Sequence, residues 1–313
     1  MSSPRLTIAI PLHRAERWVE NVSGVIELAP EWSEVVVSDA TGEDEALEQL
    51  RERFAGDGRV SFRARSERLD WREHCNLLLD ESDAEFFCWM PQDDFVEPDD
   101  YFSRLVAALE ADEEAVLAFA PAGWLVTRGR GNPLNSGGYL AIPRKEVRPG
   151  ETVLRDFYPA RDLGMGRPED DALWLLEHWM AGLIWRGVFR REVARPIPPF
   201  GPADHADLVW CFSMGLAGKL RLVPGLRYFK RFHARSAHRA FGPWNASRHS
   251  DQFRAEVEAR FGTEPARRDC VLESLDGLYR RQARERRTQR LRDLRAWLVD
   301  QPRIAVEEIP DES

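Results

Sequence analysis

Residues 86–98 read FFCWMPQDDFVEP, in which apolar and aromatic side chains lead directly into Gln92, Asp93 and Asp94. The apolar run predicts a buried strand, and an open α/β sheet binds ligands in the crevice beyond the carboxyl ends of its strands. Two adjacent carboxylates at that place suit a divalent cation, which prefers oxygen ligands. In the alternative interpretation, Asp93 and Asp94 only end the strand and cap a helix that begins near Pro98.

Strands and helices alternate along the sequence around this segment. Short β-rich or apolar runs predict strands at residues 6–11, 34–38, 60–64 and 85–90. Between them, apolar residues recur at helical spacing at residues 18–29, 47–54 and 71–79. This order predicts right-handed crossovers and a parallel sheet with helices on both faces.

The rest of the chain is less regular. Residues 128–171 are rich in Gly, Pro and Arg with little periodicity, which predicts a long functional loop or lid. On either side of this segment, periodic patterns predict helices at residues 99–110, 172–182 and 204–217, and strands at residues 115–120, 183–189, 221–223 and 227–232.

The overall composition is that of a folded protein with a substantial core, since 43% of the 313 residues are hydrophobic. The longest apolar stretch, residues 115–126, is interrupted by Pro121 and is shorter than the ~20 residues of a membrane-spanning helix. Because the N-terminal residues also lack the zones of a signal peptide, we expect a cytoplasmic protein. A formal charge of −9 argues against nucleic acid as a partner. The cysteines are too widely spaced for a zinc knuckle or a disulfide framework: Cys75, Cys88, Cys211 and Cys270.

The C-terminal segment is strongly basic. Between Tyr279 and Ala296, eight Arg stand against Glu285 and Asp293, so 8 − 2 leaves six excess positive charges on a predicted helix. One interpretation is a solvated helix that packs through its apolar residues, including at a homodimer contact. The other is peripheral attraction to the anionic inner face of the membrane, or to a lipid-linked diphosphate acceptor.

Five segments together resemble the family 2 glycosyltransferases of the GT-A fold, in order and approximate spacing, over residues 5 to 238. They are LTIAIPLHR (6–14), EVVVSDATGED (34–44), FFCWMPQDDFVEPDD (86–100), ADHADLVWCFSMGLAGK (203–219) and RLVPGLRYFKRFHARSAH (221–238). The resemblance implies an α/β fold with a Rossmann-like, mostly parallel sheet flanked by helices. It implies a GT-A glycosyltransferase domain over residues 1–240, followed by a C-terminal helical extension over residues 241–313.

The resemblance also implies a site for a nucleotide-sugar donor. The loop Pro11, Leu12 and His13 would lie against the base, and Asp39 would contact the base or the ribose. A carboxylate suits this role because it accepts hydrogen bonds from a uracil N–H or from ribose hydroxyls, and Gly42 permits the tight turn that follows. Asp39 could equally serve an Asx-turn alone.

A divalent metal, magnesium or manganese, is the implied cofactor. Asp93 and Asp94 match the D-x-D-type motif that holds the metal against the nucleotide diphosphate, and His233 matches a histidine that ligates the metal or touches the diphosphate. We therefore expect Asp93 and His233 as metal ligands, although a lone histidine is often an ordinary surface or core residue. Pro91 stands where many relatives have the first Asp of the motif, and this departure removes one possible ribose or metal contact.

Inverting transfer also needs a base that takes the proton of the acceptor hydroxyl. In the family this base is an Asp at the start of a helix, with a Gly eleven residues on. Asp207 and Gly218 fit this spacing, and Asp204 is the second choice. Either Asp could instead stabilise the helix N-terminus through the helix dipole.

The function expected from these residues is transfer of a sugar from a UDP- or dTDP-linked donor to a hydroxyl of a carbohydrate or lipid-linked acceptor, in surface polysaccharide or glycoside biosynthesis. A nucleotidyltransferase is one alternative, but residues 10–14 contain no glycine for a phosphate-binding loop. A degenerate, non-catalytic sugar-nucleotide-binding or scaffold protein is the other, suggested by Pro91 and by Ala206 at motif positions.

Overall fold

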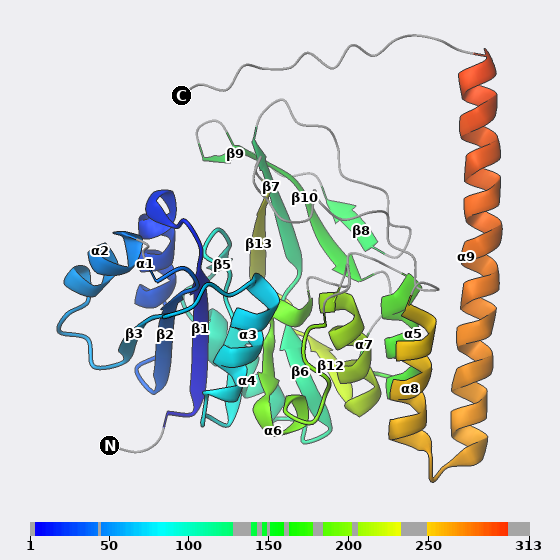
Figure 1. Ribbon diagram of the computed structural model, residues 1–313, viewed down its shortest axis with the longest axis horizontal. Coiled ribbons are helices and arrows are strands. Elements are labelled where there is room, and N and C mark those ends of the chain that lie inside the picture. Colours follow the sequence, from blue (N-terminus) through cyan, green and yellow to red (C-terminus); the bar gives the residue numbers. More distant parts are fainter. Residues whose placement is uncertain are drawn as a thin grey trace.

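The computed structural model describes residues 4–42, 45–127, 139–142, 146–148, 151–159, 163–177, 184–201, 206–232 and 249–299. Its strands form two sheets, with helices packed around the first (Figure 1). The strands of the first sheet are β1 (Leu6–Leu12), β2 (Ser33–Asp39), β3 (Val60–Ala64), β4 (Phe86–Trp89), β6 (Ala115–Phe119), β11 (Val188–Arg190) and β12 (Lys219–Leu222). Those of the second are β5 (Phe95–Glu97), β7 (Ala122–Thr127), β8 (Tyr139–Ile142), β9 (Glu146–Arg148), β10 (Glu151–Pro159) and β13 (Arg227–Phe232).

Helices connect most of the strands. A 3₁₀ turn at Glu16–Trp18 precedes the first of them. The helices are α1 (Val19–Glu27), α2 (Glu45–Arg53), α3 (Trp71–Asp80), α4 (Tyr101–Glu110), α5 (Pro168–Glu177), α6 (Arg191–Ala194), α7 (Ala206–Ala217), α8 (Ser250–Phe261) and α9 (Pro265–Val299).

The first sheet has the order β12-β6-β11-β4-β1-β2-β3. β1 pairs in parallel with β2 and β4, β2 with β3, and β12 with β6, whereas β11 is antiparallel to both β4 and β6. Side chains of a strand point alternately to opposite faces, so Leu6, Ile8 and Ile10 pack with α1, α2 and α4. Ala9 faces the other side, where α3, α5, α6 and α7 contribute to a second cluster. The predicted α/β architecture, a mostly parallel sheet flanked by helices, is confirmed.

Pro121 divides the longest apolar stretch between the two sheets, because β6 ends just before it and β7 begins just after it. In the second sheet, β13 pairs with β7 in parallel and with β5 in antiparallel orientation, and β10 pairs with β7, β8 and β9. β7 of the second sheet therefore begins directly after β6 of the first. β5, another strand of the second sheet, follows the carboxyl end of β4 after a short loop.

Two expectations about secondary structure were wrong. The loop predicted over residues 128–171 contains β8, β9, β10 and the start of α5. These strands belong to the antiparallel part of the second sheet, in which β10 pairs with β7, β8 and β9, so their sequence lacks the continuous apolar run by which β1 to β4 were predicted. The strand predicted at residues 183–189 is shorter and later, since β11 covers only Val188–Arg190 and residues 184–186 form a 3₁₀ turn.

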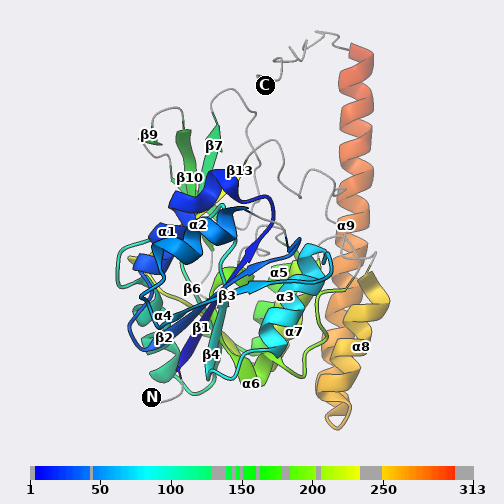
Figure 2. The same ribbon diagram turned by 60° about the vertical axis from the view of Figure 1, so that its left-hand side comes forward.

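The C-terminal helices share a hydrophobic core with α5 and α7. The rings of Phe212 and Phe253 lie 4.8 Å apart, and Val257, Leu275 and Leu278 are buried in the same cluster. Figures 1 and 2 both show the first part of α9 beside α8 and α5, and its distal part extending past them. Within the described ranges, no helix has both the length and the apolar content needed to span a membrane.

Replacement of Phe253 by Ala tests whether α8 is integral to the fold. Because this ring is fully buried against α7, Phe253→Ala should lower the free energy of unfolding by about 3–5 kcal/mol in chemical denaturation. Glu258→Ala on the exposed side of α8, which loses only a 3.6 Å surface ion pair with Arg268, is the matched control and should cost no more than about 1 kcal/mol. Equal, small effects of both changes would mean that α8 is a loosely attached appendage.

Candidate functional site

The predicted donor-binding residues lie together at the carboxyl edge of the first sheet. β1, β2 and β4 are parallel neighbours, and the register pairs Leu12 at the end of β1 with Asp39 at the end of β2. The loop that carries Asp93 and Asp94 follows β4 at the same edge. The parallel pairing therefore gathers three sequence-distant segments into one region.

The loops after β1 and β4 are joined by hydrogen bonds. The backbone N–H of His13 donates to Gln92 Oε1 at 2.7 Å, and Gln92 Nε2 donates to the His13 carbonyl at 2.9 Å. Asn21 Nδ2 on α1 donates to the carbonyls of Gln92 at 2.9 Å and Asp94 at 2.7 Å. The two loops consequently hold each other in place.

The loop expected at Pro11, Leu12 and His13 begins later in the structure, because Pro11 and Leu12 belong to β1 and His13 follows it. Leu12 is completely buried in the core, and its carbonyl accepts a hydrogen bond from the Ala40 N–H at 3.1 Å. Pro11 is partly buried, whereas His13 is exposed. Of the three residues expected to contact the donor here, His13 has the most accessible side chain.

Asp39 forms the Asx-turn that the sequence also suggested. Its Oδ1 accepts hydrogen bonds from the backbone N–H and the hydroxyl of Thr41, both at 2.8 Å, and the residue is fully buried. Gly42 has φ = +76°, and a Cβ there would lie 2.2 Å from the carbonyl oxygen of Arg65. Only glycine fits this turn, so the position of the Asp39 carboxylate depends on Gly42.

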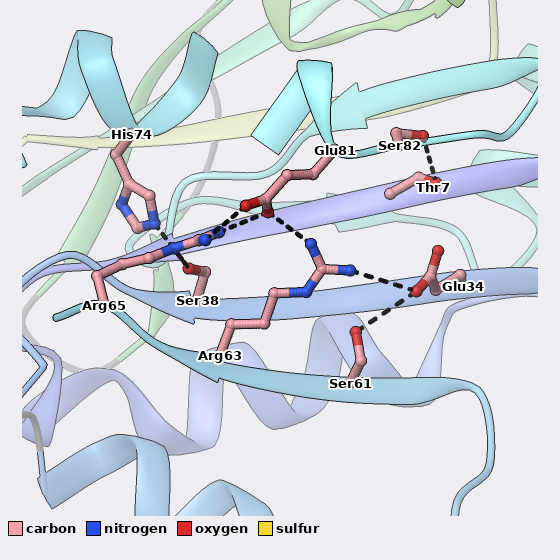
Figure 3. A network of polar contacts seen from close by, with 9 residues as sticks. All are labelled: Thr7, Glu34, Ser38, Ser61, Arg63, Arg65, His74, Glu81 and Ser82. Carbon is pink, nitrogen blue, oxygen red and sulfur yellow. Dashed lines mark hydrogen bonds and ion pairs between the residues drawn. The ribbon is translucent and has the colours of Figure 1, made fainter. Parts of the chain in front are cut away.

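A polar network includes Ser38, the residue before Asp39 (Figure 3). Ser38, next to Asp39, accepts a hydrogen bond from Arg65 Nε at 2.9 Å, and its hydroxyl lies 2.8 Å from His74 Nε2 on α3. Arg65 also pairs with Glu81 through two hydrogen bonds of 2.7 and 2.8 Å. Burial, followed by the charge of Arg65, lowers the pKa of His74 to about 4. This network, which joins β2 to α3 and to the residues that follow β3 and α3, was not predicted from the sequence.

Asp93 and Asp94 occupy different environments. Asp94 is 1% exposed, and its carboxylate accepts hydrogen bonds from the Tyr228 hydroxyl and from the backbone N–H of Arg231. The Nε of Arg186 lies 3.2 Å from its Oδ2. Burial, and then the charge of Asp93, raises the pKa of Asp94. Asp93 is partly exposed, so it is the carboxylate of the pair that a ligand can reach.

Asp207 lies in the first turn of α7, where its Oδ1 accepts a hydrogen bond from the Leu208 N–H at 3.0 Å. It belongs to the same electrostatic environment as Asp93. Burial lowers the pKa of Arg186, and the ionisable side chains around it outweigh this and raise it: Tyr228, Asp94, Asp207 and Asp93. Since charge interactions decay with distance, Asp93 and Asp207 both lie within electrostatic range of Arg186.

Lys230 on β13 completes this group. Burial, and then the charge of Arg186, lowers the pKa of Lys230 to about 8, against the opposing charges of Asp94, Asp207 and Asp93. We refer to Asp93, Asp94, Arg186, Asp207 and Lys230 as the charge cluster. The sequence analysis identified its three carboxylates but neither cation, although Lys230 lies inside the quoted segment 221–238. Asp204 and His233 are outside the described residues.

The described residues fit a metal that is shared with a ligand rather than enclosed by protein. Among them, no group of three or more His, Cys, Asp and Glu side chains is arranged to hold an ion. Magnesium is usually held by one or two carboxylates together with substrate phosphates. The partly exposed carboxylate of Asp93 meets this minimal requirement, whereas both oxygens of Asp94 already have protein partners.

Comparisons with known proteins agree with this architecture. The sequence of residues 7–154 matches the family described as Glycosyl transferase family 2. No curated protein is significantly similar in sequence to this chain. The crystal structure of S. aureus TarS 1–349 superposes with a TM-score of 0.58 at 14% identity, covering 87% of this chain and 70% of that one.

Two ligand-bound structures are also similar. TarS 1–349 in complex with UDP-GlcNAc has a TM-score of 0.56 at 13% identity and covers 86% of this chain and 70% of that one. GalNAc-T7 with UDP, GalNAc and Mn²⁺ has a TM-score of 0.50 at 16% identity and covers 75% of this chain and 45% of that one. At these identities the likeness establishes the fold that they share.

The buried His74 should make stability depend on pH. Its pKa is about 4 in the folded protein, against an ordinary value of 6.5. Between these values the unfolded chain binds a proton at His74 that the folded protein does not, so this contribution is complete above pH 6.5 and is lost as the pH falls toward 4. His74→Gln cannot titrate, and between pH 7 and 4.5 it should lose about 2 kcal/mol less free energy of unfolding than the wild type. Parallel stability curves from denaturant titrations would contradict this.

Proposed function

We propose, from the premise that residues 7–154 belong to glycosyl transferase family 2, that this protein is an inverting glycosyltransferase. It would move a sugar from a UDP- or dTDP-linked donor to an acceptor hydroxyl. The observation that carries the proposal is the charge cluster: Asp93 follows β4, its neighbour Asp94 pairs with Arg186 at 3.2 Å, and Asp207 in the first turn of α7 lies within electrostatic range of the same arginine. Inverting transfer requires the donor diphosphate and the catalytic base to lie on either side of the transferred sugar ring. The composition of the charge cluster supports such a site.

The nucleoside would bind between the loops after β1 and β2. His13 is exposed there, and Asp39 would accept hydrogen bonds from the ribose or the base once the ligand competes with the Asx-turn. Of the structures similar in fold, one TarS structure contains UDP-GlcNAc and that of GalNAc-T7 contains UDP. These ligands favour a uridine donor for this chain.

In the reaction, Asp207 would take the proton of the acceptor hydroxyl while the oxygen of that hydroxyl attacks the anomeric carbon of the donor sugar. The bond between that carbon and the diphosphate oxygen breaks on the opposite face of the sugar, which inverts the configuration. A magnesium or manganese ion held by Asp93, and by His233 from outside the described residues, would supply positive charge to the departing diphosphate. Asp94 would hold the loop in position through its contacts with Tyr228 and Arg231.

The acceptor would be a carbohydrate or a lipid-linked glycan in surface polysaccharide or glycoside biosynthesis, on the cytoplasmic side of the membrane. Support comes from α9, where Arg281 pairs with Glu177 and Gln282 bonds the Leu176 carbonyl, so the helix packs on α5 up to this point. Beyond it, Arg284 and Arg287 are exposed. Such a basic, protruding segment suits an anionic lipid surface, and a homodimer contact is the competing use.

Replacement of Asp207 by Asn tests the base. Asp207→Asn keeps the size of the side chain but cannot accept the proton, so transfer should fall by at least about 10²-fold while binding of UDP is retained. A panel of nucleotide-sugars, screened by thermal shift, identifies the donor first, and calorimetry with UDP and turnover assays then compare the variants.

Asp170→Asn is the matched control, because Asp170 also lies in the first turn of a helix, α5, and pairs only with the exposed Arg167. Its activity should equal that of the wild type. An active Asp207→Asn enzyme would remove Asp207 as the base, and a wild-type protein that binds no nucleotide would favour the scaffold alternative.

The two adjacent carboxylates should respond differently to the same substitution. Asp93→Asn should weaken manganese-dependent UDP binding with little change in melting temperature, because Asp93 is partly exposed. Asp94→Asn removes the counter-charge of the buried Arg186, so the free energy of unfolding should fall by about 3–5 kcal/mol. Calorimetry measures UDP binding and thermal melts measure stability. If Asp93→Asn instead lost stability and Asp94→Asn instead lost only UDP binding, the roles given to the two residues would have to be exchanged.

A further inference from the structure

Arg186 lies at the carboxyl edge of β4 because β11 runs against its neighbours. In the antiparallel register, Arg190 pairs with Phe86 and Phe189 with Phe87, so the chain before β11 approaches the loop that follows β4. Gly187 permits a very close approach to β6, since a Cβ there would lie 2.2 Å from the carbonyl oxygen of Ala118. Arg186 is therefore placed beside the Asp93–Asp94 loop by the backbone itself.

The guanidinium of Arg186 is buried but incompletely bonded. The residue is 8% exposed, and its guanidinium carbon lies 4.6 Å from the ring centroid of Trp185 and 5.8 Å from that of Tyr228. Nε is 3.2 Å from Asp94 Oδ2, an ion pair without hydrogen-bond geometry. Nη1 is also buried and has no hydrogen-bond partner in the described part of the chain.

Most buried polar atoms in native proteins have a hydrogen-bond partner, so a buried guanidinium with two nitrogens that no described residue hydrogen-bonds is an unusual feature. The adjacent Trp185 has the same property, because its Nε1–H is buried and no described residue accepts from it. Both groups can only donate hydrogen bonds. The ligand that satisfies them must therefore offer acceptor oxygens.

The surrounding charges favour an anionic ligand. Lys230 lies on β13 two residues after Tyr228, whose ring centroid is 5.8 Å from the Arg186 guanidinium carbon, and the charge of Arg186 contributes, after burial, to the lowering of the pKa of Lys230 to about 8. The nearest anion, Asp94, is already shared among Arg186, Tyr228 and the Arg231 N–H. An added anion between Arg186 and Lys230 would offset their mutual repulsion.

We propose that Arg186 binds the diphosphate of the nucleotide, through the Nη1 edge of its guanidinium, and so neutralises part of the leaving-group charge with protein in addition to metal. The inference rests on the proposed function and adds to it a residue outside the motif segments. A guanidinium binds phosphate oxygens bidentately, a geometry that lysine does not reproduce. Because Pro91 leaves Asp93 as the single accessible carboxylate of the motif, such a cation would allow UDP to bind appreciably without a divalent ion.

Calorimetry with UDP and with uridine, each in EDTA and in manganese, tests this on the full chain. The wild type should bind UDP in EDTA more tightly than uridine. Arg186→Lys keeps a charge opposite Asp94 but removes the planar fork, and it should weaken UDP binding in EDTA by about tenfold or more while uridine affinity changes less than twofold. The difference between the two ligands isolates the diphosphate contact from any general disturbance of the site.

Arg190→Lys is the matched control, since Arg190 lies on the same strand and bonds the carbonyls of Ala115 at 3.0 Å and Leu109 at 2.7 Å, at the opposite edge of the sheet. It should bind both ligands as the wild type does. If Arg186→Lys does not fold, the double variant Arg186→Gln with Asp94→Asn removes the ion pair without leaving an uncompensated charge, and it should show the same selective loss.

The outcomes separate the two proposals. Unchanged UDP affinity in Arg186→Lys, or an equal loss of UDP and uridine binding, would overturn the role of Arg186 while the glycosyltransferase proposal stands. A wild type that binds neither UDP nor uridine under any condition would overturn the proposed function itself. Selective loss of UDP binding supports both.

Discussion

The buried carboxylate of Asp94 is the interaction on which the arrangement of the site depends. It follows a strand of the first sheet, accepts hydrogen bonds from Tyr228 and Arg231 of the second sheet, and forms an ion pair with Arg186 ahead of β11. A buried charge is tolerated only when it is paired and hydrogen-bonded. The three partners must therefore be in place together, which couples the position of the second sheet to that of the first.

This coupling has a consequence for the neighbouring residue. Asp94 is buried and engaged with the protein, whereas Asp93 is partly exposed, and the backbone carbonyl of Asp93 accepts a hydrogen bond from Arg231 Nε at 3.1 Å. The carboxylate of Asp94 thus holds the loop in position, and that of Asp93 is the more exposed of the two. Groups that are held before the ligand arrives can stabilise developing charge without reorganising during the reaction, which is the main electrostatic requirement of a transferase site.

The amino-terminal half of the fold could be predicted from the sequence because its signals are local. β1, β2 and β4 are continuous apolar runs that form buried parallel strands, and the apolar faces of α1 to α4 repeat at helical spacing. The second sheet could not be predicted in this way. β8 and β9 pair with β10, which itself pairs with β7 of the second sheet, and the composition of this segment, rich in Gly, Pro and Arg, is typical of a loop.

The same distinction holds within the site. Asp39, Asp93 and Asp207 follow strands or begin a helix, so their positions could be identified along the sequence, and that alone determined the edge of the sheet at which a ligand would bind. Arg186 and Lys230 could not be identified, because their place depends on the direction of β11 and on the pairing of β13 with β5 and β7. The tertiary structure alone decided which carboxylate is buried and which cations surround it, since burial and charge proximity arise only when segments distant in the chain pack together.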